Sequence, residues 1–380
     1  MTNAHNLDAL RRFAVARSLF QTVDLHDAIE RFGFLQADPI RAPARAQDLT
    51  LRHRVTAYRA GDLERRYATL PIEEAFFVNY GFVTERLHAL MHPRGRIATW
   101  PTRRRARAEA ILAYLRERGS VHPREVDAHF AHGRVTNYWG GSSNASTHML
   151  DQLHYLGLLR VTRRDAGIRV YGARESDATT FVRLPTSEID ARLDALVAVI
   201  VDKYAPLPWA SLTPLVRRLR YAVPQWQARI PRALERAKAR LAQSRVDGVA
   251  WSWPAEATIA GEVRDEVRLL APFDPIVWDR RRFELLWGWA YRFEAYTPLA
   301  KRQLGYYALP LLWRDRVIGW GNASVTAGVM RVELGYVSGK RPKDRGFTRE
   351  LDAELERLRA FLDVGTQQPS AGPDSPAPCN

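Results

Sequence analysis

The sequence contains little cysteine and no long apolar run. Its one cysteine, Cys379, leaves the chain without an internal disulfide or a zinc site built from cysteines, so a reducing cytoplasm is the expected compartment. No stretch of about 18 apolar residues is present to span a bilayer, so no membrane association is expected. Residues 1–13 are polar with two arginines and lack the apolar core of a signal peptide, so we expect no secretion.

Common catalytic motifs are missing as well. There is no Gly-x-Ser-x-Gly elbow, no Walker loop and no Gly-x-Gly-x-x-Gly between a strand and a helix, which removes the usual hydrolase, NTPase and dinucleotide-binding classes. His129 and His132 have helical spacing with Glu125 one turn earlier, but no His-Glu-x-x-His pattern accompanies them. We therefore expect these histidines at the surface, and neither a metal nor a cofactor.

Apolar and charged residues occur in ordinary amounts. Of the 380 residues, 46% are hydrophobic and 26% charged, which excludes a disordered chain and predicts a folded protein with a substantial core. A chain of this length is two to three times a usual domain, so two or three compact units are expected.

The charge balance is strongly basic. Lysine and arginine number 57 against 42 acidic residues, which gives a net charge of +15 and predicts a polyanionic partner, with nucleic acid first. Only five of the basic residues are lysines; a GC-rich genome also produces such an arginine-rich chain, so the net charge is the stronger signal. The candidate contacts are arginines that cluster in the sequence: Arg41, Arg45, Arg52, Arg54, Arg103, Arg104 and Arg105. Taken singly, each of them is equally well explained as a solvated surface residue.

Apolar spacing predicts helices followed by short strands. The first 95 residues read as two amphipathic helices between Leu7 and Gly33, split near Gln21, then helices over 62–67 and 85–91, the last with Thr84 as its N-cap. Helices are expected over 103–118, 123–130 and 145–155, then a hairpin over 158–171 that turns at 165–167. Three helices and a hairpin make a winged helix, which either reads DNA through its third helix or serves only as a packing unit.

The rest of the chain mixes helices with strands. Helices are predicted over 188–204, 209–219 and 226–242, and strands over 248–253 and 263–269. Alternating aromatic and β-branched residues between 273 and 336 predict a small antiparallel β-barrel, and 347–362 a closing helix. Residues 365–380, rich in proline, serine and glycine, are expected to be a disordered tail. The fold class is therefore α+β.

The segment Gln36-Ala37-Asp38-Pro39 is the best candidate for chemistry. Proline biases the preceding residue toward an extended backbone, and extended residues two apart face the same side. Gln36 and Asp38 would then present an amide and a carboxylate about 6 to 7 Å apart at their Cα atoms, close enough to hold one water. The alternative is an ordinary Asp-Pro turn. Asp274 and Asp279, in an aromatic setting, are interpreted as turn and ion-pair residues.

Three longer runs carry a family resemblance. They are Leu270-Ala-Pro-Phe-Asp-Pro-Ile-Val-Trp-Asp-Arg280, Tyr291-Arg-Phe-Glu-Ala-Tyr-Thr-Pro298 and Lys301-Arg-Gln-Leu-Gly-Tyr-Tyr307. With these runs the chain resembles the AlkZ/YcaQ family of bacterial DNA glycosylases from about residue 7 to 362, including Tyr138-Trp139. The resemblance implies three tandem winged helices and a β-barrel in a C shape around DNA. The implied division is winged helices over 1–95, 101–180 and 185–270, the barrel and closing helix over 271–363, and the tail over 364–380.

The same resemblance assigns roles to residues. Gln36-Ala37-Asp38 matches the family's Gln-x-Asp motif, the YcaQ-like form associated with N7-alkylguanines and nitrogen-mustard interstrand crosslinks. Asp38 would activate water and stabilise the oxocarbenium ion, and Gln36 would position that water. Lys301, Arg302 and Gln303, in the third run, are expected to contact DNA, although Lys301 could make a structural contact in place of one to phosphate. Two departures stand out: Glu73-Glu74-Ala75 replaces a His-Glu-Ala triplet, a change expected to alter the lesion pocket, and Asn322 replaces an aspartate.

The predicted function is a monofunctional DNA glycosylase for base excision repair. It would hydrolyse the N-glycosidic bond of cationic N7-alkylated purines or of interstrand crosslinks in duplex DNA, as a monomer in the cytoplasm associated with the nucleoid. One alternative is a non-catalytic winged-helix DNA-binding or regulatory protein, and another is a structural scaffold. Gln36 and Asp38 favour the enzyme.

Overall fold

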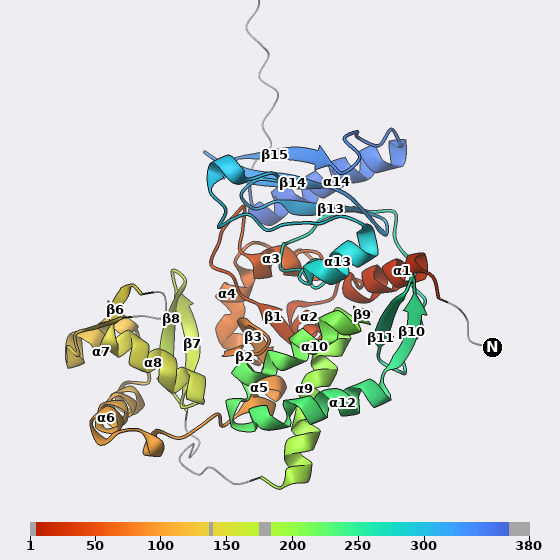
Figure 1. Cartoon of the computed structure of the whole chain (residues 1–380). Helices are drawn as coiled ribbons and strands as arrows, with labels where there is room; N and C mark the ends of the chain where they lie inside the picture. The colour runs from red at the N-terminus through yellow and green to blue at the C-terminus, as the bar shows by residue number, and fades with distance from the viewer. Residues whose placement is uncertain (1–4, 137–139, 175–183, 365–380) are drawn as a thin grey trace, which may run out of the picture.

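Four groups of helices and strands follow one another in the computed structural model, which describes residues 5–136, 140–174 and 184–364 (Figure 1). The second group stands out to one side of a larger body made of the other three. The predicted disordered tail and Tyr138-Trp139 lie outside the described residues. Within the described ranges, no helix combines the length and apolar character needed to cross a membrane.

The first group surrounds a three-stranded antiparallel sheet. Its elements are α1 (Leu7–Ser18), α2 (Leu25–Phe32), β1 (Phe34–Gln36), α3 (Ala46–Leu51), α4 (Asp62–Arg66), β2 (Ile72–Phe76), β3 (Tyr80–Thr84) and α5 (Glu85–Met91). The strand order is β1-β3-β2. The predicted cap of α5 is confirmed, because the Thr84 side chain accepts the N–H of Leu87.

The second group has the predicted helices and hairpin. It comprises α6 (Thr102–Arg118), β4 (Ser120–Val121), α7 (Pro123–Phe130), β5 (Arg134–Thr136), β6 (Ser142–Asn144), α8 (Ala145–Leu156), β7 (Leu159–Asp165) and β8 (Ile168–Ala173). Strand β8 lies between β4 and β7 in one sheet, and β5 pairs with β6. The helices form where apolar residues recur on one face: Ala108, Ile111, Leu112 and Leu115 of α6 are buried.

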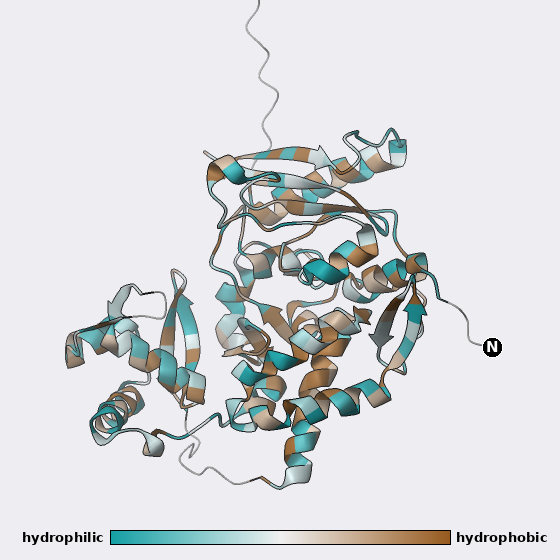
Figure 2. Ribbon diagram, viewed as in Figure 1, coloured by the Kyte–Doolittle hydropathy of each residue, from teal (hydrophilic) through white to brown (hydrophobic). Residues whose placement is uncertain are grey.

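The third group is mainly helical. It contains α9 (Thr186–Tyr204), β9 (Leu207–Pro208), α10 (Trp209–Arg217), α11 (Leu219–Ala222), α12 (Ile230–Arg240), β10 (Ala242–Val246) and β11 (Val249–Trp253). The β10–β11 hairpin and β9 form a small sheet in the order β10-β11-β9. Helix α9 runs through the apolar interior of the body (Figure 2).

The fourth group differs from the predicted barrel. It contains β12 (Val267–Leu269), α13 (Arg280–Trp287), β13 (Leu309–Trp313), β14 (Arg316–Thr326), β15 (Val329–Tyr336) and α14 (Arg345–Leu362). Within the described residues the strands form an open, curled sheet in the order β12-β13-β14-β15, with a bulge between Leu311 and Leu312. Residues 273–308 form α13, a 3-10 turn and other turns, and their aromatic side chains pack on one another, with Trp287, Trp289 and Tyr291 in tilted pairs around Phe283.

The groups share their hydrophobic cores. Leu10 and Phe13 of α1 pack in one cluster with Leu196 and Ile200 of α9, so the first and third groups are joined by apolar contacts. Strand β12 pairs with β13 although it precedes the predicted boundary at residue 270, so it belongs to the C-terminal sheet. The body around β1 is therefore built from segments far apart in the sequence.

Candidate active site

Strand β1 brings the Gln-x-Asp segment into the centre of the body. Its last residue, Gln36, pairs with Gly81 of β3. A Cβ atom at Gly81 would collide with the carbonyl oxygen of Leu35, so glycine is needed for β1 and β3 to approach. The strand then gives way to a turn as Ala37 donates to the carbonyl of Tyr80 (3.1 Å).

Asp38 is buried, with 8% of its surface exposed. Its Oδ1 accepts the N–H of Ile40 (2.9 Å), and its own N–H donates to Gln47 Oε1 (3.2 Å). This is the Asx turn expected around an Asp-Pro pair, but it uses only one carboxylate oxygen. The Ile40 N–H is the donor that the structure gives to this carboxylate within the described ranges, and Oδ2 is not one of the fully enclosed polar atoms without a partner. Burial raises the pKa of Asp38 and outweighs the opposing effect of the Ile40 N–H.

Gln36 is held by a tryptophan that lies 242 residues away in the sequence. Its Oε1 accepts a hydrogen bond from Trp278 Nε1 (2.5 Å). Because the amide carbonyl is engaged in this way, the amide N–H groups of Gln36 remain to hold a water. That Gln36 and Asp38 share one water stays a prediction.

Two buried arginines fix the segment that carries Trp278. Arg54 forms a bidentate pair with Asp274 (2.7 and 3.0 Å), and Arg282 donates to the carbonyls of Pro275 and Ile276 (3.2 and 3.1 Å). Asp279 caps α13 by accepting the N–H of Arg282. The structural interpretation of Asp274 and Asp279 is therefore confirmed, and both act to position Trp278.

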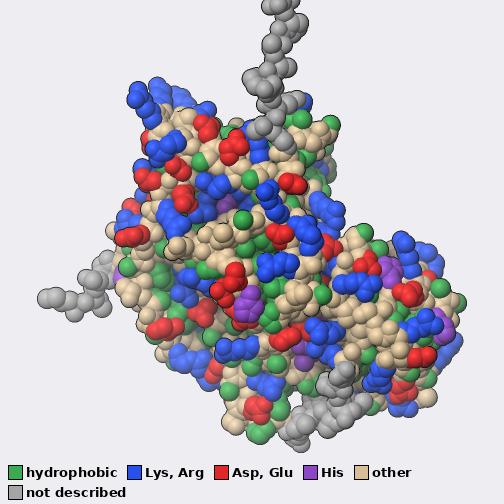
Figure 3. Space-filling view, turned by 180° about the vertical axis from the view of Figure 1, so that it is seen from behind, with side chains coloured by type: hydrophobic (Ala, Val, Ile, Leu, Met, Phe, Trp, Pro, Cys, Tyr) green, Lys and Arg blue, Asp and Glu red, His purple; other side chains and the backbone are tan. Residues whose placement is uncertain are grey.

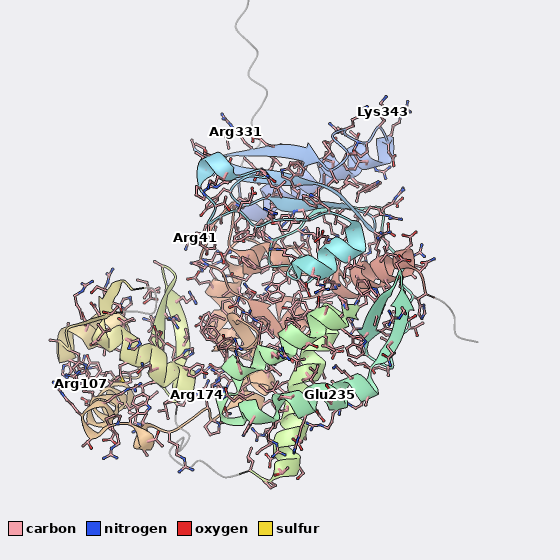
Figure 4. The ribbon with its side chains drawn as sticks, in the orientation of Figure 1. Arg41, Arg107, Arg174, Glu235, Arg331 and Lys343 are labelled. Atoms are coloured by element: carbon pink, nitrogen blue, oxygen red, sulfur yellow. The ribbon has the colours of Figure 1, made fainter. Side chains whose placement is uncertain are left out.

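Two predicted DNA contacts are wrong. Arg54 is fully buried in its pair with Asp274, and Arg52 donates to Glu354 (2.5 Å) and to the carbonyl of Leu269 (2.9 Å). Neither guanidinium is available to phosphate. Arg45 is half-buried against Glu64, whereas Arg41 is exposed at the edge of the body that faces the outlying group (Figure 4).

Tyrosines surround Asp38 on the side of the C-terminal group. Tyr307 is 3% exposed, and its hydroxyl has no hydrogen-bond partner in the part of the chain that the structure describes. Burial and, after it, the negative charge of Asp38 raise the pKa of Tyr307. The phenol therefore lies in the neighbourhood of the carboxylate. Tyr307 packs on Phe293 (ring centroids 5.3 Å apart), which packs on Phe273.

The loop between α13 and β13 carries the predicted Lys301, Arg302 and Gln303. Lys301 and Gln303 are exposed and help line a surface hollow of about 600 Å³ together with Phe293 and Arg280. Arg302 is half-buried and donates to the carbonyl of Thr297 (2.8 Å).

Two polar side chains hold this loop in place. Glu294 Oε2 accepts the N–H groups of Gln303, Leu304 and Gly305 (2.8, 2.8 and 3.3 Å). Asn322 of β14 donates through Nδ2 to the carbonyl of Leu304 (2.7 Å). An ionised aspartate at 322 has no N–H or O–H to donate to this carbonyl, so the asparagine found here in place of an aspartate allows β14 to hold the loop.

The Glu73-Glu74-Ala75 departure lies on β2, where the first group contacts the second. Glu73 pairs with Arg160 (3.3 Å) and Arg174 (2.8 Å), and Glu74 with Arg164. Burial raises the pKa of Glu73 against the effect of these arginines. Both carboxylates are thus paired with basic residues of the β7–β8 hairpin and the segment after it. Arg174 lies between the two groups (Figure 4).

One lysine comes close to β1 although none is near Gln36 in the sequence. Lys203, at the end of α9, donates through Nζ to the carbonyl of Phe34 and lies 4.2 Å from the ring centre of Phe32. Burial lowers the pKa of Lys203 well below its usual range. Its amine is engaged with the strand that ends in Gln36.

The remaining predicted residues lie on the outlying group. Arg103 and Arg104 are exposed on α6, where Arg104 stacks 3.9 Å from the ring centre of Trp100 and bonds Gln152 (2.7 Å). His129 stacks on Tyr114, while Glu125 caps α7, so each has a local partner. On the face seen in Figure 3, basic and acidic side chains are interspersed.

Two comparisons with known proteins bear on this site. A family model described as DNA glycosylase AlkZ-like matches residues 29–361. Among solved structures, the DNA glycosylase AlkZ of Streptomyces sahachiroi is similar, with a TM-score of 0.61, 13% identity, and coverage of 95% of this chain and 98% of that chain. At this identity the structural likeness shows the fold alone.

Proposed function

The chain belongs to the AlkZ-like DNA glycosylase family and is a DNA glycosylase, and on this premise we propose that it removes cationic N7-alkylated purines and the related interstrand crosslinks from duplex DNA. The observation that carries the proposal is the state of Asp38. Its carboxylate is buried and has one oxygen fixed by the Ile40 N–H, the donor that the structure gives to it within the described ranges.

The chemistry needs only these groups. An N7-alkylated guanine already carries a positive charge, so the bond between N9 and C1′ breaks with its electron pair moving to the base, and no general acid is required. The sugar becomes an oxocarbenium ion that the Asp38 carboxylate stabilises. Water adds to C1′ and gives its proton to Asp38, leaving a free base and an abasic site. The raised pKa of Asp38 favours this proton transfer.

Gln36 acts on the same water. Because Trp278 Nε1 holds the carbonyl of the Gln36 amide, the N–H groups are fixed in direction. A water that accepts from Gln36 and donates to Asp38 is oriented with a lone pair free for C1′. Gln36 is thus a positioning residue, whose loss costs less than loss of the charge.

DNA is the proposed partner of the exposed basic residues. Arg41 follows the catalytic segment and Lys301 and Gln303 line the hollow beside Phe293, so phosphates on both sides of the lesion have partners. The second group, with three helices and the β7–β8 hairpin, supports a winged-helix assignment. The three-domain division and the monomeric state belong to the same proposal.

The test is single-turnover release of 7-methylguanine from methylated duplex DNA, with binding measured on the same oligonucleotide. Asp38→Asn keeps the shape and removes the charge, so excision falls by about 10² to 10⁴ while affinity stays equal or rises slightly. Gln36→Ala costs less. Asp247→Asn, at an exposed turn after β10, is the matched control and behaves as wild type.

Two results would change the assignment. If Asp38→Asn excises as fast as wild type, Asp38 is only a turn residue and the mechanism is wrong. If the wild-type protein binds duplex DNA but releases no alkylated base, the non-catalytic DNA-binding function takes its place.

A further inference from the structure

Two large apolar side chains project into solvent beside the candidate active site. Tyr296 and Leu299 are each 80% exposed, the highest values among the exposed large hydrophobic residues in the described part of the chain. They lie three residues apart in the loop between α13 and β13. Single exposed apolar residues are common, but two large ones this close together in a loop that continues into Lys301 and Arg302 are typical of a contact surface.

The exposure does not come from a loose loop. The N–H of Thr297 donates to the carbonyl of Glu294 (2.9 Å), and Glu294 and Asn322 hold the following residues, 303–305. Arg302 closes the loop on itself by donating to the carbonyl of Thr297 (2.8 Å). Tyr296 and Leu299 are therefore presented on a preorganised backbone, as a rigid recognition element requires.

The loop is connected to Asp38 through packed rings. Tyr296 packs edge-on against Phe293 (ring centroids 6.0 Å apart), and Phe293 against Tyr307 (5.3 Å). Desolvation and the negative charge of Asp38 raise the pKa of Tyr296. Tyr296 thus stands within electrostatic reach of the carboxylate, and Leu299 lies in one turn with the phosphate-binding candidate Lys301.

We propose that Tyr296 and Leu299 form a wedge that enters the base stack next to the damaged nucleotide and opens the duplex so that C1′ can reach Asp38. This inference rests on the proposed function. Apolar side chains between two base pairs unstack and kink DNA, and neighbouring cations bind the displaced phosphates. Duplex DNA also explains why two apolar residues are followed directly by Lys301 and Arg302, a combination that a purely apolar protein partner would not favour.

Excision from two duplexes tests the wedge. One carries 7-methylguanine in a normal pair, and the other carries it opposite an abasic site, where the stack is already open. Tyr296→Ala combined with Leu299→Ala lowers release from the paired duplex by about 10- to 100-fold, because unstacking is no longer assisted. On the opened duplex the loss stays within about 3-fold. Restoring the ring with Tyr296→Phe in place of Tyr296→Ala recovers most of the rate on the paired duplex.

Controls separate the wedge from the chemistry. Val337→Ala, at another exposed apolar residue (48%), leaves both rates unchanged. Asp38→Asn lowers both rates equally. If the wild-type protein releases no base from either duplex, the proposed function is refuted. The wedge is then tested by the fluorescence of 2-aminopurine placed beside the lesion. This fluorescence rises when the wild-type protein binds and does not rise when the double variant binds. Equal losses on both duplexes, or an unchanged fluorescence rise in the double variant, overturn the wedge.

Discussion

The buried pair of Arg54 and Asp274 allows a sharp test of how this site is built. Both side chains are fully buried and joined by two hydrogen bonds (2.7 and 3.0 Å), and Arg54 also donates to the carbonyls of Ser18 and Thr50. Asp274→Asn keeps the shape but leaves the buried guanidinium without a counter-charge. Breaking such a pair costs about 3 to 5 kcal/mol. For a chain of 380 residues, an unfolding entropy of about 2.1 cal/mol/K per residue corresponds to slightly more than about 1 °C per kcal/mol, so the melting temperature falls by about 4 to 6 °C.

Thermal unfolding followed by circular dichroism measures this loss. Asp265→Asn is the control, because Asp265 pairs with Arg314 at the surface with similar geometry (2.7 Å), and solvent screens an exposed pair so that its loss changes stability little. Replacing both buried partners, Arg54→Met with Asp274→Leu, recovers most of the stability, since no charge is left unpaired. If Asp274→Asn lowers the melting temperature no more than Asp265→Asn, the assignment of Arg54 to structure is refuted.

The remaining predictions concern DNA binding and catalysis. The logarithm of the affinity for undamaged duplex falls linearly with the logarithm of the salt concentration, with a slope of magnitude about 4 to 8. Arg41→Ala reduces that magnitude by about 1, and Arg54→Met leaves it unchanged. An affinity that does not change with salt contradicts DNA binding. Borohydride traps no covalent complex, because the Lys203 amine is occupied by the carbonyl of Phe34; trapping that Lys203→Met abolishes would show lyase chemistry instead. Because burial raises the pKa of Asp38, the excision rate falls with acid at a pH above the ordinary value of 3.8. The raised pKa also means that ionisation of Asp38 lowers the free energy of unfolding. Asp38→Asn is therefore more stable than wild type at pH 7, and it loses this advantage below pH 3.8. Unfolding in urea at the two pH values measures the difference.

Local patterns in the sequence located most of the helices. Apolar residues three and four apart predicted both ends of α6 and of α7 to within one residue. Thr84 correctly predicted the start of α5, because an N-cap depends only on residues nearby in the sequence. The proline at 39 left two interpretations of Asp38 open, an extended carboxylate for chemistry and an ordinary turn. The structure shows the turn, in which Oδ1 accepts the N–H of Ile40, and the catalytic role of Asp38 stays a prediction.

Long-range partners were the part that sequence could not supply. Arg54 looked like a DNA contact because it follows other arginines, but its partner Asp274 lies 220 residues later. Trp278 lies in the first of the runs that carry the family resemblance, but its hydrogen bond to Gln36 depends on the packing of two segments that are distant in the sequence. The barrel predicted over 273–336 is confirmed only in part: the alternation over 309–320 forms β13 and β14 of the curled sheet, whereas the aromatic residues between 283 and 291 pack in tilted ring pairs, which periodicity does not distinguish from strands.

The charge pairs on β2 have a mechanical consequence. Glu73 and Glu74 belong to the sheet whose edge strand is β1, and their arginine partners belong to the outlying group. A swing of that group would have to pull apart buried charges or drag β2 and its neighbours with it. The outlying group is therefore tied by charge pairs to β2, and only the central strand β3 separates β2 from the strand that carries Gln36, so a shift of that group would be transmitted to the sheet behind the candidate active site.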